Sequence, residues 1–71
     1  MQWVKKFGTS YTTDAWWYAA SFPGGEAYAE LVNGNWIWGV VIGGKRACGF
    51  TGSLEAAQAA VTARLQSLGV L

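Results

Sequence analysis

Apolar and polar positions in residues 26–50 form three short runs separated by two glycine-containing pairs. The pairs are Asn33-Gly34 and Gly43-Gly44. Both are typical of two-residue hairpin loops, because a type I′ turn needs a positive φ at both of its central positions. The pattern therefore predicts three antiparallel strands joined by two tight turns.

The two turns also determine which residues face each other across neighbouring strands. Counting outward from the first turn places Ala29 opposite Trp38, and counting outward from the second places Gly49 opposite Trp38. Successive strand residues point to opposite faces of a sheet, so Trp36 and Trp38 share one apolar face with small partners. We expect a further element of the fold to cover this face.

Residues 15–22 are rich in aromatic side chains and predict another strand before these three. If Pro23-Gly24 forms a two-residue loop, Tyr18 lies opposite Ala29 and extends a row of alternating large and small side chains. A loop longer by one residue would turn every side chain of this strand over. We expect the first register, because it buries more apolar surface.

The N-terminal part of the chain gives weaker patterns. Residues 3–7 alternate in a way that suggests a short strand, with Lys5 and Lys6 on a solvated edge. Residues 8–14 are rich in Thr and Ser and fit either a loop or the beginning of the next strand.

Residues 53–68 have the periodicity of an amphipathic helix. One stripe collects its apolar residues: Leu54, Ala57, Val61, Leu65 and Leu68. Ser53 is placed to cap the first turn, and Gly69 to end the helix. We therefore predict an α+β fold in a single domain, residues 1–71. It is an antiparallel β-meander of three to five strands with one C-terminal helix packed across one face.

The face opposite the helix is the main functional clue, because we expect it to stay uncovered. It carries aromatic, aliphatic and charged side chains: Trp17, Tyr28, Ile37, Val41 and Phe50, with Glu26, Glu30 and Arg46 between them. Exposed clusters of this kind mark interfaces. The candidate occupants are a second copy in a homodimer, a host protein and the N-terminal strand itself. Lys45 and Arg46 form a basic hairpin tip that would favour an acidic partner.

Composition narrows the chemistry. The chain has 71 residues, a formal charge of +1, one cysteine and no histidine. Cys48 cannot form an internal disulfide, and we expect neither a metal site nor a cofactor. No histidine is present to take the thiol proton, so we expect Cys48 to be a small buried or half-buried hydrophobe and the protein not to be an enzyme. A free thiol without a secretory signal predicts a cytoplasmic location, and no membrane contact is expected.

Nucleic acid is an alternative partner. Aromatic side chains on antiparallel sheets stack on single-stranded bases in several folds, and Trp17, Tyr28 and Phe50 would take this role here. Glu26 and Glu30 would repel phosphates from the same surface. A third alternative is a structural protein whose uncovered face is wholly used in self-assembly.

Residues 35–65 are similar in style to small proteins of phages and prophages. The shared features are a tryptophan-rich hairpin, a Gly-Phe step at Gly49-Phe50, and a serine cap at Ser53 before an alanine-rich helix. The resemblance implies a protein that occupies a surface of a host macromolecule, as anti-CRISPR inhibitors do, and it transfers no binding residue. We therefore expect a small non-enzymatic inhibitor or adaptor that binds a host protein or ribonucleoprotein.

Overall fold

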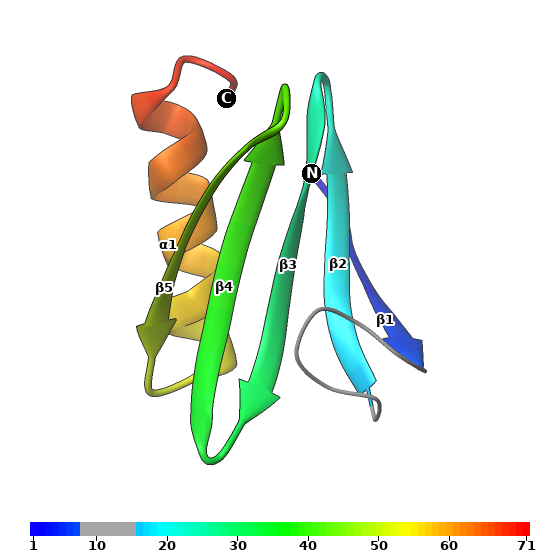
Figure 1. The fold of residues 1–71 in the computed structure, drawn as a ribbon, viewed down its shortest axis with the longest axis vertical. Coiled ribbons are helices and arrows are strands. Elements are labelled where there is room, and N and C mark those ends of the chain that lie inside the picture. The colour runs from blue at the N-terminus through cyan, green and yellow to red at the C-terminus, as the bar shows by residue number, and fades with distance from the viewer. Residues whose placement is uncertain (8–15) are drawn as a thin grey trace.

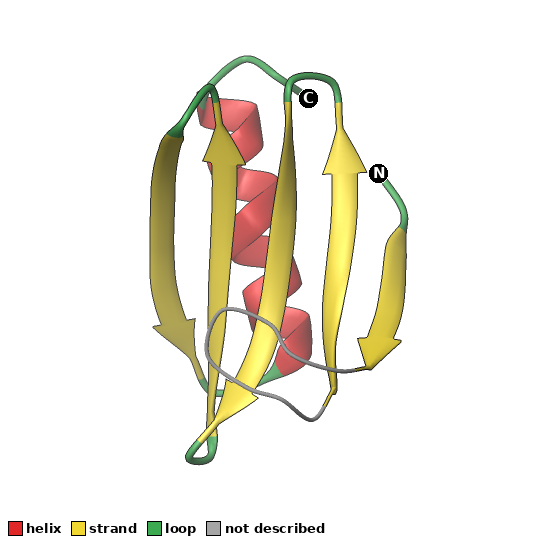
Figure 2. Cartoon of the chain, turned by 45° about the vertical axis from the view of Figure 1, so that its right-hand side comes forward, coloured by secondary structure: helices red, strands yellow, loops and turns green. Residues whose placement is uncertain are grey.

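The computed structural model describes residues 1–7 and 16–71. These residues form five strands and one helix: β1 (Trp3–Phe7), β2 (Trp16–Phe22), β3 (Gly25–Val32), β4 (Asn35–Ile42), β5 (Lys45–Thr51) and α1 (Leu54–Ser67). The strands make one antiparallel sheet in chain order, with α1 on one side (Figures 1 and 2). The predicted α+β meander is confirmed. Residues 8–14, and Ala15 at the start of the predicted strand 15–22, lie outside the described residues.

Both glycine-containing hairpin turns are confirmed. The φ angles are 51° at Asn33 and 82° at Gly34, and 56° and 80° at Gly43 and Gly44. Positive φ at both central positions defines the type I′ turn, whose twist matches that of the flanking strands. The turns therefore align β3 with β4 and β4 with β5 in the predicted register.

The loop between β2 and β3 also has two residues, Pro23 and Gly24. Only Gly24 has a positive φ, 93°, which is typical of a type II turn. Tyr18 pairs with Ala29, so the predicted register of this strand is confirmed.

Large side chains lie over glycines on both faces of the sheet. On the helix side, a Cβ placed on Gly49 would lie 2.9 Å from Nε1 of Trp38. On the other side, a Cβ placed on Gly39 would clash with Cζ, Cε1 and the hydroxyl oxygen of Tyr28. The alternation of large and small residues predicted for the helix side is thus present, and a similar packing fills the middle of the opposite face.

The beginning of α1 follows the sequence closely. The backbone N–H of Ala56 donates a hydrogen bond of 3.1 Å to Oγ of Ser53, which confirms the predicted cap. In the described part of the chain, no helix is long and apolar enough to cross a membrane.

The end of α1 differs from the prediction at Leu68. The helix ends at Ser67, Gly69 has a φ of 77°, and the N–H of Val70 donates to the carbonyl oxygen of Leu65 at 2.9 Å. This arrangement turns the chain back so that Val70 packs against the core, while Leu68 is 52% exposed. Leu68 was expected in the buried stripe, and that prediction is wrong.

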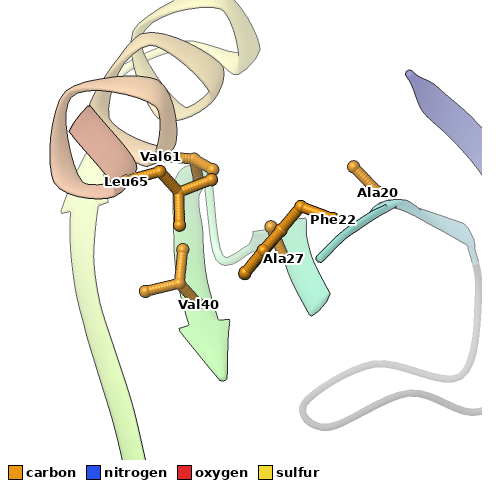
Figure 3. Packing of buried hydrophobic residues seen from close by; sticks show 6 residues of the cluster. All are labelled: Ala20, Phe22, Ala27, Val40, Val61 and Leu65. Carbon is orange, nitrogen blue, oxygen red and sulfur yellow. The ribbon is translucent and has the colours of Figure 1, made fainter. Parts of the chain in front are cut away.

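The core lies between α1 and the β2–β4 part of the sheet (Figure 3). It consists of small and aliphatic residues around one phenylalanine: Ala20, Phe22, Ala27, Val40, Val61 and Leu65. Trp38 packs against this cluster, as predicted. A helix is about 10 Å wide and strands are spaced about 4.8 Å apart, so one helix spans only two or three strands. Accordingly, α1 packs on β3, β4 and β5 and does not extend over β1.

Candidate functional site

The sheet face that points away from α1 is here called the open face. The strand register places these side chains on it: Val4, Lys6, Trp17, Ala19, Ser21, Glu26, Tyr28, Glu30, Ile37, Val41, Arg46, Cys48 and Phe50. All eight residues predicted for the uncovered face are among them. The turn-based register therefore sorted the two faces correctly.

Accessibility divides the eight predicted residues into three groups. Phe50 is 73% exposed, and Glu26 and Arg46 are also exposed. Trp17, Ile37 and Val41 are half-buried, so each can contribute only part of its surface to a contact with a partner. The two remaining predicted residues, Tyr28 and Glu30, are buried.

Tyr28 and Glu30 are therefore not contact residues in this conformation. Tyr28 is 5% exposed because its ring occupies the space above Gly39, and Glu30 is 0% exposed. Glu30 belongs to the central strand, where it lies between Trp17 and Ile37 in one row across the sheet. Glu30, which was expected to repel phosphates together with Glu26, therefore presents no accessible surface on this face. Strand alternation gives the face of a residue, whereas its exposure depends on the size of its neighbours.

Cys48 is exposed, in contrast to the expectation of a buried or half-buried side chain. The reason is its position on β5, which is the last strand of the sheet and has a neighbour on one side only. Phe50 follows on the same strand and the same face, which explains why its ring is also accessible.

The N-terminal strand enlarges the open face and does not cover it. β1 pairs edge to edge with β2, and this brings Lys6 directly opposite Trp17. The Nζ atom of Lys6 lies 5.8 Å from the centroid of the Trp17 ring, and Val4 is 52% exposed. Eight residues separate β1 from β2 in the sequence, so a two-residue turn could not be used to predict this register, and Val4 and Lys6 were missed as candidate site residues.

A hollow of about 340 Å³ lies on the open face at β1 and β2. Val4, Lys6, Trp17 and Ala19 line its sheet side, and Glu26 adds an acidic group from β3. The hollow therefore combines apolar surface with one basic and one acidic side chain.

A cluster of three aromatic rings lies on the helix side of the sheet. The ring centroid of Trp16 is 5.9 Å from that of Tyr18 and 5.9 Å from that of Trp36. Nζ of Lys5 lies 4.6 Å from the Trp16 ring, a favourable cation–π geometry. These half-buried rings contact one another, so we infer that they stabilise the fold and do not form a binding site.

The predicted basic tip is present, since Lys45 and Arg46 are both exposed at the start of β5. Among residues 1–7 and 16–71 there is no group of three or more side chains that could hold a metal ion. The open face thus offers apolar contact surface bordered by a few charges, which is chemistry suited to binding.

Comparisons with protein-family models, with curated proteins and with solved structures find no match.

Proposed function

We propose that the chain is a small non-enzymatic binding protein whose open face occupies a surface of a host protein or ribonucleoprotein, as an inhibitor or adaptor. The observation that carries this proposal is Phe50, whose ring is 73% exposed on the side of the sheet without the helix. Burying a phenylalanine side chain stabilises an association by about 1.5–3 kcal/mol. A partner that covers the Phe50 ring would gain this contribution.

The surroundings of Phe50 support a protein partner. Ile37 is the cross-strand neighbour of Phe50, and Val41 follows on the same strand and face as Ile37. Both are half-buried. The exposed charges of Glu26 and Arg46 lie in the row of Val41, which is separated from the row of Phe50 by the row of Tyr28, Gly39 and Cys48. An apolar centre with a charged border is the usual organisation of a non-obligate protein interface.

The similarity to small phage proteins indicates where to look for the partner. The resemblance implies action on a host macromolecule, so a host lysate is the appropriate source. The bait variants should alter the open face without altering the fold.

The test compares two aspartate variants, Phe50→Asp and Phe7→Asp. Phe7 is 77% exposed, close to the value for Phe50, but pairs with Trp16 on the helix side of the sheet. We expect a specific host protein to be retained by the unchanged chain and by Phe7→Asp, and to be lost with Phe50→Asp. Equal retention by all three baits, measured by quantitative mass spectrometry, would refute the open face as the binding surface.

Self-association through the open face is a second candidate, because soluble oligomers are mostly symmetric homodimers. Light scattering of the purified chain gives its mass directly. A dimer that Phe50→Asp converts to a folded monomer, and Phe7→Asp leaves intact, would assign the open face to a second copy. A monomer in all three samples would exclude the homodimer.

Single-stranded nucleic acid is the third candidate, and the pairing of Lys6 with Trp17 favours it. A cation beside an indole is the combination that holds a phosphate and stacks a base. Titration of tryptophan fluorescence with oligonucleotides would then show quenching that weakens strongly with salt. A flat titration at low salt would exclude this function.

A further inference from the structure

A second hollow, of about 410 Å³, lies where the end of α1 meets the β4–β5 hairpin. Five apolar residues contribute to its lining: Val40, Ile42, Ala47, Leu68 and Val70. Three basic residues also line it: Lys45, Arg46 and Arg64. It is on the helix side of the sheet, because Ile42 and Lys45 pair with each other on that face.

The basic side chains come from two elements that are distant in the sequence. Lys45 begins β5, and Arg64 lies in the last turn of α1. Packing of α1 on β4 and β5 brings the two residues to one hollow. Two basic side chains, those of Lys45 and Arg64, are thus brought to this hollow, while the strand register places the side chain of Arg46 on the open face.

None of the described residues that line this hollow is acidic. Of the acidic residues that the structure describes, Glu26 is on the open face, Glu30 is buried, and Glu55 is in the first turn of α1. Arg64 follows Glu55 by nine residues, a rise of about 14 Å along the helix, which is longer than the Debye length of about 8 Å at physiological salt. A bound anion would therefore meet basic side chains without a competing carboxylate in the lining.

The apolar part of the hollow is partly accessible. Leu68 is 52% exposed, and Ile42 and Val70 are half-buried. Because the chain turns back after Ser67, Leu68 and Val70 both lie beside Arg64 in this hollow. Apolar surface next to two kinds of cation is complementary to a molecule with an anionic head and an apolar chain.

We propose that this hollow binds an amphipathic organic anion, with a carboxylate or phosphate head held by Lys45 and Arg64. Guanidinium groups bind both heads in a bidentate manner, and the lysine ammonium adds a point charge. The apolar chain would lie on Ile42, Leu68 and Val70. The volume is within the range of about 300–1,000 Å³ that is usual for small-ligand sites. The site is separate from the open face and does not depend on the function proposed for it.

The test is a titration of the ¹⁵N-labelled chain, followed by amide chemical shifts, with decanoate, decyl phosphate and decanol below their aggregation concentrations. We expect saturable shifts at Ile42, Ala47, Leu68 and Val70. We also expect an affinity for at least one of the anions that is about tenfold higher than for decanol at low salt, since two ion pairs are added. The tighter of the two anions identifies the head group. Raising the salt concentration should reduce this advantage without any change of sequence.

Two double variants that lower the charge equally complete the test. Lys45→Gln with Arg64→Gln should bring the affinity for the anions down to that for decanol. Lys5→Gln with Lys6→Gln, on β1, should leave the affinity for the anions unchanged. All four side chains are exposed, so the folds should persist, and the amide spectra report this directly. Equal affinities for the anions and decanol, shifts outside the hollow, or anion binding that survives loss of Lys45 and Arg64 would each overturn the proposal. Phe50→Asp should retain anion binding. This variant therefore distinguishes anion binding at the hollow from partner binding at the open face.

Discussion

Gly39→Ala tests the packing that gives the open face its shape. A Cβ at Gly39 would clash with the hydroxyl end of the Tyr28 ring, and Tyr28 is only 5% exposed. Overpacking of this kind costs about 1–3 kcal/mol. For a domain of 60–100 residues, each kcal/mol lowers the melting temperature by about 4–8 °C, so we expect a decrease of roughly 5–20 °C in a thermal melt followed by circular dichroism.

Gly52→Ala is the matched control for this experiment. Gly52 is exposed, and a Cβ placed there would have no neighbour within 4 Å. Both substitutions reduce the conformational entropy of the unfolded chain in the same way, so the difference between them isolates the contact with Tyr28. In a Tyr28→Ala background, the additional cost of Gly39→Ala should largely disappear, because the clashing ring is absent. Equal melting temperatures for Gly39→Ala and Gly52→Ala would show that Tyr28 does not cover Gly39, and our account of the open face would be wrong.

Two further predictions concern the helix. Leu65→Ala should lower the free energy of unfolding by about 2–5 kcal/mol, because Leu65 is 0% exposed, whereas Leu68→Ala should change it by less than about 0.5 kcal/mol, because Leu68 is 52% exposed. Urea denaturation measures both, and similar losses for the two variants would contradict the observed end of α1. Ser53→Ala should cost about 1 kcal/mol, because it removes the acceptor of the hydrogen bond from Ala56, and Ser53→Asp should retain most of the stability. An unchanged denaturation midpoint for Ser53→Ala would mean that the cap contributes nothing.

The meander could be predicted because its determinants are local. Asn33-Gly34 and Gly43-Gly44 favour one turn geometry, and a two-residue turn fixes the pairing of all residues on both of its strands. The faces of the sheet follow from that pairing by strict alternation. The same reasoning placed Trp38 under the helix and Phe50 on the opposite side, as the structure shows.

Accessibility could not be predicted in this way. Tyr28 and Phe50 share the open face, yet Tyr28 lies in the central strand with its ring over Gly39, whereas Phe50 lies in an edge strand. Lys6 was not predicted as a site residue because eight residues separate its strand from the strand of Trp17, and a two-residue turn could not be used to count the pairing. Exposure depends on neighbours from other strands, and the identity of those neighbours is a property of the assembled sheet.

The sequence by itself determined the two glycine-containing turns from β3 to β5, the cap at Ser53 and the side of the sheet on which each residue of these three strands lies. These features depend on residues a few positions apart, whose backbone preferences act over short distances. Only the tertiary structure decided that Glu30 is buried, that Cys48 is exposed, and that Lys45 and Arg64 meet at one hollow. Those outcomes depend on which side chains the assembled sheet and helix bring together. Glu30 lies between Trp17 and Ile37 on the central strand, Cys48 lies on an edge strand, and the packing of α1 on β5 brings Arg64 to Lys45.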